Sequence, residues 1–294
     1  MSPTKRLVAQ ASAPAHITGF FEICEHDDIM KKGSTGCGVV LDRGVRTTVT
    51  VSEDIDMTEL FLNGFEVAGE TSKAVAQLIT ERPVRIESIA EIPIGCGFGA
   101  SGAGALGTAY ALNKALSMEL TANQLNDIAH VAEVSRHSGL GDVTGQIHGG
   151  IVIRRTPGAP STSAADIIPS KDVHVYCVAL GEMPTESILS DPGIIKHINE
   201  GGKRQMKRLI QKPTIDNFML CSRDFTIQSG LAGKKVTEVI EASDSIGVVA
   251  SQAMLGNAVF AIPDPSVAST LEETFMQFGK VLKFKVMTGC IKIS

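Results

Sequence analysis

The chain has 294 residues, a formal net charge of -5 at pH 7 and no basic run longer than pairs such as 203–204 and 207–208. This balance gives no electrostatic reason to expect nucleic acid or a membrane surface as a partner, and no apolar run approaches the roughly 18 residues of a membrane-spanning helix, so we expect a small, soluble ligand. The six cysteines form no C-x-x-C spacing, which argues against a zinc site or a disulfide framework and favours the cytoplasm.

The N-terminal third of the chain is predicted to be mostly antiparallel β structure. Residues 35–51 are rich in β-branched side chains and predict two strands that turn at Asp42–Gly44. Residues 60–67 predict a second hairpin, because Asn63-Gly64 is a strong two-residue turn signal. A helix at 70–80 and a strand at 84–92 follow.

The middle of the chain predicts two helices and then a strand. The first helix covers residues 103–116. The second helix runs to about residue 137, and its start is marked by Thr121 and Gln124, which match a capping box. A strand begins at Gly149-Gly150.

A linker is predicted at residues 156–163, which are rich in Pro, Ser and Thr. We place a domain boundary there, which gives one domain of residues 1–160 and another of residues 161–294. In the second domain we expect strands at 173–180, 281–286 and 290–293 and helices at 194–207, 216–229 and 235–242. Strands and helices that mix without strict βαβ alternation predict an α+β fold.

A glycine-rich stretch at residues 93–107 joins the strand at 84–92 to the alanine-rich helix that follows. Glycines let a backbone approach a bulky anion, and a helix N-terminus offers it unpaired N–H groups and a positive dipole end. The stretch matches neither the G-x-x-x-x-G-K-[ST] signature nor that of a dinucleotide fold. We interpret it as a phosphate-binding loop, and close helix packing or a simple turn is the alternative.

Two polar residues near this loop are candidates for holding a cation. Ser101 is predicted at the first turn of the helix, where its hydroxyl can reach a phosphate oxygen, reach a Mg²⁺ ion that bridges two phosphates, or cap the helix. Glu133 falls at the edge of the apolar stripe of the next helix. Its carboxylate is either paired with a base such as Arg136 or held inward for a cation.

Asp142 follows that helix and is flanked by glycines, which give the backbone freedom to push a carboxylate into a cleft. The commoner use of such an aspartate is to cap a helix or a turn. In a phosphoryl-transfer site Asp142 would accept the proton of a substrate hydroxyl while Glu133 holds the metal.

These motifs resemble those of the GHMP small-molecule kinases. Residues 93–106 are similar to the family's second motif, P-x-G-x-G-L-x-S-S-A, with Phe98 in place of the usual Leu and Gly102 in place of the second Ser. Glu133 and Asp142 correspond in order and spacing to the metal-binding Glu and the catalytic Asp of the mevalonate kinase branch. Within the superfamily, the chain most resembles the archaeal pantoate kinases in three segments, which are 14–21, 32–44 and 139–146.

The resemblance implies transfer of phosphate from ATP, with Mg²⁺, to the 4-hydroxyl of pantoate, giving 4-phosphopantoate on a route to coenzyme A. It also implies an α+β GHMP kinase fold, with an N-terminal domain like ribosomal protein S5 domain 2 and a C-terminal ferredoxin-like domain. Ser101 and Glu133 would coordinate the metal, and the family's third motif is represented only by residues 254–258. The expected nucleotide-binding residues are Pro93, Gly95, Gly97, Phe98, Gly99, Ala100, Ser101, Gly102 and Ala103.

Pantoate is a small carboxylate with hydroxyls and a gem-dimethyl group, so its site needs a cation, hydrogen-bonding groups and an apolar wall. Arg154 and Arg155 leave a predicted strand on opposite faces, and we assign Arg154 to the cleft. His16 in the shared N-terminal motif and the loop residues Ser34 and Thr35 are further candidates for substrate binding. The alternative interpretations are a solvated strand-end residue for either arginine and a core histidine for His16.

Thr185, in the loop after the first strand of the second domain, could lend its hydroxyl to the substrate or to the transferred phosphate, or be a plain turn residue. One alternative function is phosphorylation of another small hydroxyl acceptor, such as mevalonate, homoserine or shikimate. The other is a non-catalytic nucleotide-binding regulator of the same fold. A homodimer is one assembly that the sequence allows.

Overall fold

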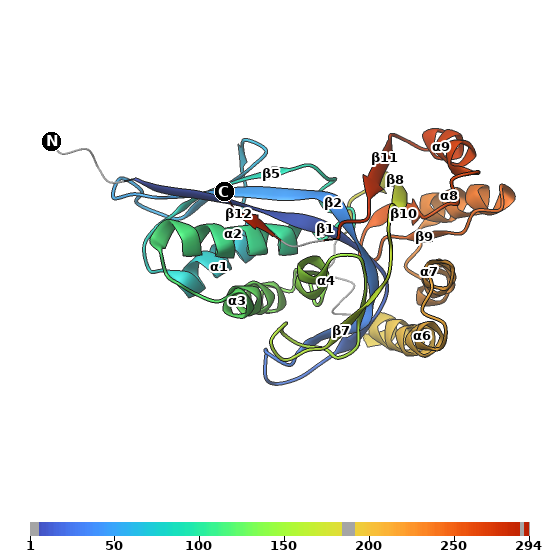
Figure 1. Cartoon of the computed structure of the whole chain (residues 1–294), viewed down its shortest axis with the longest axis horizontal. Coiled ribbons are helices and arrows are strands. Elements are labelled where there is room, and N and C mark those ends of the chain that lie inside the picture. The colour runs from blue at the N-terminus through green and yellow to red at the C-terminus, as the bar shows by residue number, and fades with distance from the viewer. Residues whose placement is uncertain (1–5, 184–191, 289–290, 294) are drawn as a thin grey trace.

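The computed structural model describes residues 6–183, 192–288 and 291–293 and contains two sheets with their helices (Figure 1). The larger sheet has eight strands in this part of the chain, and the smaller sheet has four. Helices and strands do not alternate in regular βαβ units, so the predicted α+β class is confirmed. None of the helices in the described ranges is long and apolar enough to cross a membrane.

The larger sheet is built around two long antiparallel strands, β1 (Leu7–Cys24) and β2 (Gly33–Val51). The predicted hairpin turn at Asp42–Gly44 is therefore wrong. Between the pairs Pro14–Gly44 and His16–Val40, β1 advances by two residues and β2 by four, so the turn-forming residues sit in a β-bulge of one continuous strand. Glycine is needed at 44 because a Cβ there would lie 2.1 Å from the Ala13 carbonyl oxygen.

The remaining strands extend this sheet on both sides of the long pair. The hairpin at Asn63-Gly64 is confirmed, and both residues have the positive φ of a two-residue turn, 51° and 87°. Beyond β2 lie, in order, β5 (Arg85–Ala90), β3 (Glu59–Leu62) and β4 (Phe65–Glu66). On the other side, β12 (Lys292–Ile293) pairs with β1. Strand β6 (Ile151–Arg154) pairs with β2 and with β7 (Ala165–Ile168).

The predicted linker at 156–163 joins β6 to β7 within the larger sheet. The chain passes to the smaller sheet later, between Ile168 at the end of β7 and His174 at the start of the next strand. A division of the chain into domains at residue 160 stays a prediction.

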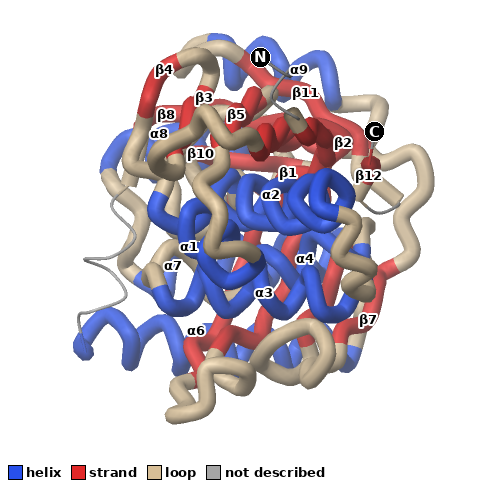
Figure 2. Tube along the Cα trace, turned by 90° about the vertical axis from the view of Figure 1, so that its left-hand side faces the viewer, coloured by secondary structure: helices blue, strands red, loops and turns tan. Residues whose placement is uncertain are grey.

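One face of the larger sheet is covered by four helices (Figures 1 and 2), which are α1 (Glu70–Ile79), α2 (Ala100–Leu116), α3 (Ala122–Ser135) and α4 (Asp142–His148). The capping box at Thr121 is confirmed. Helix α2 lies closest to the long strands, because Gly107 has no side chain and a Cβ there would lie 2.7 Å from Thr47 Oγ1. The short helix α4 escaped prediction because it contains Gly145 and has only seven residues.

The second half of the chain forms the smaller sheet, in the order β11 (Val281–Lys285), β8 (His174–Gly181), β10 (Asn257–Ala261) and β9 (Ala250–Gln252). Its helices are α6 (Pro192–Gln211), α7 (Ile215–Ser229), α8 (Lys234–Ser245) and α9 (Ala268–Met276), of which α9 was not predicted. Helix α6 packs directly on β1, since a Cβ at Gly202 would lie 2.1 Å from the Phe21 carbonyl oxygen. One hydrophobic core cluster thus spans both halves, and a second cluster lies between the smaller sheet and helices α8 and α9.

Candidate active site

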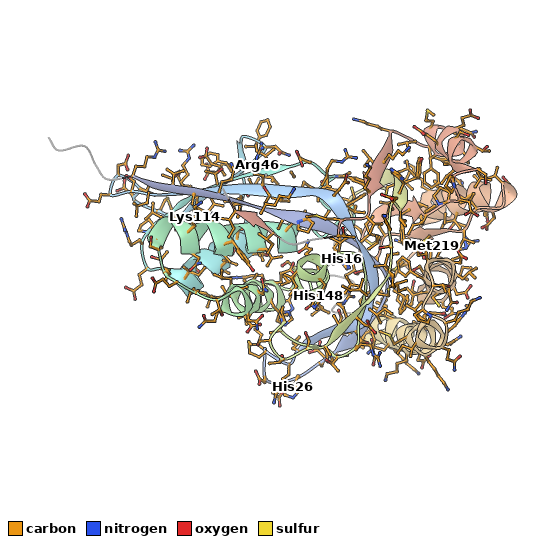
Figure 3. All side chains as sticks on the ribbon, in the orientation of Figure 1. His16, His26, Arg46, Lys114, His148 and Met219 are labelled. Carbon is orange, nitrogen blue, oxygen red and sulfur yellow. The ribbon has the colours of Figure 1, made fainter. Side chains whose placement is uncertain are left out.

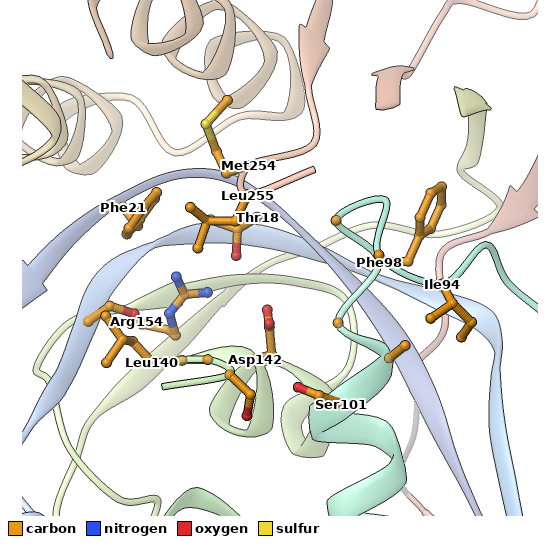
Figure 4. Close-up of a pocket in the computed structure, with 18 residues that line it drawn as sticks. Thr18, Phe21, Ile94, Phe98, Ser101, Leu140, Asp142, Arg154, Met254 and Leu255 are labelled. Carbon is orange, nitrogen blue, oxygen red and sulfur yellow. The ribbon is translucent and has the colours of Figure 1, made fainter. Parts of the chain in front are cut away.

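A cleft of about 200 Å³ opens where the glycine-rich loop, the start of α4 and a turn at residues 253–256 meet (Figure 4). Ser101 and Asp142 face this cleft from the helix starts, and Arg154 enters it from β6. Segments from both halves of the chain therefore build one site.

The glycine-rich loop has the backbone of an anion-binding loop. Gly95, Gly97 and Gly99 have φ of 70°, 89° and 64°, and residues other than glycine rarely adopt such positive values. Helix α2 begins at Ala100, three residues earlier than predicted, and its N-cap Gly99 makes no side-chain cap. The first turn of α2 thus offers its N–H groups to an anion in the cleft.

Most of the predicted nucleotide-binding residues border this cleft, and three do not. Gly102 is buried in the first turn of α2, where a Cβ would lie 2.8 Å from Gln146 Oε1 and 3.1 Å from Glu133 Oε2. Pro93 and Ala103 are also absent from the lining. The predicted residues that do line the cleft are Gly95, Gly97, Phe98, Gly99, Ala100 and Ser101.

The turn at 253–256 holds the glycine-rich loop from the other side. A Cβ at Gly256 would lie 2.0 Å from the Cys96 carbonyl carbon and 2.2 Å from the Gly97 nitrogen. The turn itself is fixed by Gln252 Nε2, which donates to the Gly256 carbonyl at 2.9 Å. The short segment at 254–258 therefore contacts the glycine-rich loop through Gly256.

We expect Gly256→Ala to destabilise the fold and to raise the KM for ATP. The new Cβ would meet backbone atoms that cannot move independently, and overpacking of this kind costs about 1–3 kcal/mol. Denaturant unfolding and the KM for ATP measure the two effects. Gly233→Ala is the matched control, because a Cβ at Gly233 meets nothing within 4 Å. An equal response of the two variants would contradict the tight contact.

Ser101 and Glu133 meet below the start of α2. Ser101 Oγ donates to Glu133 Oε1 at 2.5 Å, and Glu133 is 1% exposed. The alternative pairing of Glu133 with Arg136 is wrong, because Arg136 pairs with Glu70 at 3.6 Å. Burial raises the pKa of Glu133 to about 8, and the nearby Asp142 carboxylate adds to this increase.

A divalent cation fits this pair. Mg²⁺ prefers oxygen ligands and commonly takes only one or two from protein side chains, with phosphates and water supplying the rest. The Ser101 hydroxyl and the Glu133 carboxylate are such ligands, at the start of a helix that favours phosphate. Burial is the largest cause of the raised pKa of Glu133, and a bound cation would offset the cost of burying its charge.

We expect Glu133→Gln to raise the Tm of the protein free of metal and nucleotide, most strongly near pH 8. The ordinary pKa of this carboxyl is 4.5 and the folded value is about 8, so the folded state binds more protons between these values and wild-type stability falls as pH rises through them. Glutamine has no charge to desolvate. Melting curves at pH 5 and pH 8 test this, with the exposed Glu273→Gln as control. A pH-independent Tm difference would contradict it.

Asp142 is the first residue of α4 and lines the cleft between Ser101 and Arg154 (Figure 4). Its Oδ1 lies 2.7 Å from His16 Nδ1, and the Thr18 hydroxyl also bonds to the carboxylate. Burial by itself would raise the pKa of Asp142, but the His16 hydrogen bond and charge and the nearby Arg154 outweigh it and lower the pKa. Asp142 is therefore held as a carboxylate.

His16 lies behind Asp142, in the interior beside α4 (Figure 3), and does not line the cleft. It is fully buried, and burial lowers its pKa. Gly38 and Gly145 make room for the ring, because Cβ atoms there would lie 2.3 Å and 2.6 Å from it. His16 is therefore placed to orient Asp142. A direct contact of His16 with the substrate stays a prediction.

The two arginines at the end of β6 have different surroundings. Arg154 is 2% exposed, lines the cleft and has an Nε without a hydrogen-bond partner in the described structure. The side chain of Arg155 is 47% exposed and pairs with Asp166 at 3.8 Å, outside the cleft. Of the two arginines, Arg154 is therefore the one that an acidic ligand in the cleft could meet.

The other predicted substrate residues differ in position. Ser34 is buried and lines the cleft. Thr35 does not line it, and its hydroxyl instead donates to Glu22 Oε2 at 3.3 Å. Thr185 lies outside the described residues.

Several residues in and around the cleft were missed. Thr18, which lines the cleft next to a β-bulge in β1, was not singled out. The same is true of Gln146, which is buried outside the cleft lining and supports the loop, because its Nε2 donates to the Gly99 carbonyl at 2.8 Å. The sequence did contain a signal for these contacts, which is the pair Gly36 and Gly38 within a predicted strand. Glycine inside a strand often marks a place where another group approaches the backbone closely. A Cβ at Gly36 would lie 3.1 Å from Arg154 Nη2, and Gly38 makes room for His16.

A second, apolar cavity of about 400 Å³ lies on the other side of the glycine-rich loop, under the β3–β4 hairpin. Leu60, Leu62 and Val67 line it. The two cavities share Ile94, Ala100 and Ser101. One ligand with an apolar end and an anionic end could therefore occupy both.

Comparisons with known proteins identify a family and relatives for this chain. Residues 66–150 match the family model for the GHMP kinases N terminal domain. A pantoate kinase of Methanospirillum hungatei is 34% identical over 285 residues, which cover 95% of this chain and 94% of that protein. A solved structure described as a phosphotransferase related to CoA biosynthesis pathway has a TM-score of 0.88 and 29% identity, covering 98% of this chain and 99% of the other.

A more distant structure supports the fold alone. It is described as MDDEF in complex with MVAPP, AMPPCP and magnesium, and it has a TM-score of 0.76 at 15% identity, covering 99% of each chain. Together with the two sheets, these likenesses confirm the expected mixed α+β architecture.

Proposed function

This chain belongs to the GHMP kinase family, and from that premise we propose that it transfers the terminal phosphoryl group of ATP to the 4-hydroxyl of pantoate. One observation carries the proposal. A carboxylate, Asp142, lies between a phosphate loop on one side and the buried, unpartnered donor of Arg154 on the other. The similarity to a pantoate kinase over nearly the whole chain supports the choice of acceptor.

ATP would span both cavities. The apolar cavity beside α1 suits a nucleobase, and the shared border at Ala100 and Ser101 leads the phosphates over the first turn of α2. Ser101 and Glu133 would hold Mg²⁺, which when bound neutralises charge on the phosphates.

Asp142 would act on the acceptor. Its carboxylate accepts the proton of the 4-hydroxyl as the hydroxyl oxygen forms a bond to the terminal phosphorus, and the bond from that phosphorus to the bridging oxygen breaks to release ADP. His16 and Thr18 hold the carboxylate in place. Arg154 would bind the carboxylate of pantoate at the far end of the cleft. Positioning and charge neutralisation supply most of the catalysis.

An acceptor screen tests the proposal. Coupled ADP release is measured with pantoate, mevalonate, homoserine and shikimate at saturating Mg-ATP. We expect turnover with pantoate and no turnover above background with the others. A preference for another acceptor would reassign the substrate, and nucleotide binding without ADP release on any acceptor would favour the non-catalytic alternative.

We also propose a reducing, cytoplasmic setting for this activity. All cysteines in the described residues are free, namely Cys24, Cys37, Cys96, Cys177 and Cys221. A homodimer remains a prediction.

A further inference from the structure

The acceptor end of the cleft has an apolar surface that the proposed chemistry leaves unused. Three side chains form it, and we refer to them as the apolar wall: Phe21, Leu140 and Leu255. They lie around Arg154 on the side of Asp142 away from Ser101, while the side chain of Met254 points away from Arg154 (Figure 4). The wall therefore lies where the carbon skeleton between an acceptor's carboxylate and its reacting hydroxyl would sit.

Sheet register places Phe21 of the wall beside the cation. Phe21 of β1 pairs with Gly36 of β2, and Gly36 pairs in turn with Arg154 of β6. Because Gly36 has no side chain, the guanidinium lies over its backbone, with Nη2 3.1 Å from where a Cβ would be. The missing side chain lets an apolar group and a buried cation line the same small cleft.

Leu255 occupies an unfavourable backbone conformation. Its φ is 60°, and among the described residues it is the only apolar non-glycine residue with positive φ. Glycine would fit this turn without strain, so the leucine side chain is present here against the backbone preference, and strain of this kind gathers at ligand sites. The bond from the Met254 N–H to the Thr18 carbonyl, at 3.0 Å, keeps the turn against β1.

We propose that the apolar wall, with Leu255 as its central member, recognises the dimethyl-bearing carbon of the acceptor and makes the site selective for hydroxy acids branched next to the reacting CH₂OH group. This rests on the proposed function. Arg154 binds the carboxylate, Asp142 accepts the proton of the hydroxyl, and the apolar wall contacts the methyl groups between them. A chain lacking the methyls would leave the wall exposed to water.

The test compares pantoate with 2,4-dihydroxybutanoate, which has the same carboxylate and hydroxyls but no methyl groups. For the wild type, kcat/KM should favour pantoate, since a methyl in an apolar pocket contributes about 10-fold to 200-fold. Leu255→Gly should lower this preference by about tenfold or more through loss of kcat/KM for pantoate alone. Glycine suits the φ of 60°, so the fold should persist.

Two further variants make the result decisive. Leu140→Ala removes a half-buried member of the wall in a different segment and should also reduce the preference. Asp172→Gly makes the same kind of backbone change at φ 55° outside the cleft and should leave it unchanged. An unchanged preference in both wall variants, or a wild type that uses both acids equally, would overturn the proposal. A wild type that phosphorylates neither acid would contradict the proposed function itself.

Discussion

Replacing Asp142 by Asn is expected to lower kcat by about 10²-fold to 10⁴-fold, which is the usual contribution of a positioned general base. Asparagine keeps an oxygen that can accept the hydrogen bond from His16, so the shape of the site should persist while the proton acceptor is lost. ATP affinity should change little, because Asp142 lies beside the phosphate loop and not within it. Steady-state kinetics and calorimetric ATP binding measure the two quantities.

Asp216→Asn is the matched control for this experiment. Asp216 is also the acidic residue in the first turn of a helix, α7, but it is exposed and does not line the cleft. It should retain wild-type kcat, which separates proton transfer from any effect on a helix dipole. Wild-type turnover by Asp142→Asn would remove this residue from the mechanism.

Arg154→Met is expected to have the second largest effect. Removing one partner of a buried, hydrogen-bonded charge pair costs about 2–5 kcal/mol, which corresponds to a loss of about 30-fold to 4,000-fold in kcat/KM for pantoate. Methionine fills similar space without a charge to desolvate, so the fold should be retained. The KM for ATP should stay near the wild-type value, because Arg154 lies at the other end of the cleft.

The neighbouring Arg155→Met provides the control. It removes the same side chain from the next position of the chain, where the guanidinium is exposed. The pair of variants thus separates the effect of a cation within the cleft from that of net charge. Equal kcat/KM for the two variants would contradict a role for Arg154 in binding the acceptor carboxylate.

Local patterns in the sequence predicted much of the fold and about half of the residues that line the candidate site. The Asn63-Gly64 hairpin and the capping box at Thr121 were predicted correctly because each depends on the backbone of only a few residues. The glycine-rich stretch was also predicted to lead into a helix, and its glycines have positive φ directly before α2, while its binding of phosphate stays a proposal. The roles assigned to Ser101 and Asp142 remain proposals that these experiments test.

The strand prediction failed where long-range pairing decided the outcome. Asp42–Gly44 has the composition of a turn, yet pairing with β1 over its whole length makes it a bulge. Helix α4 and the strand β7 gave no clear local pattern, because each is short and is stabilised mainly by its neighbours in the fold.

The sequence by itself determined the glycine-rich turn and the helix after it, to which we assign the phosphates, because such a turn can bind an anion through its own backbone. Only the tertiary structure decided the acceptor half. It brought Phe21 and Leu255, more than two hundred positions apart, to one cleft and set His16 behind Asp142. It also placed Arg154 in the cleft and Arg155 outside it. Such placements depend on strand register and on close approach at glycines such as Gly36, which are properties of packed segments and not of the local chain.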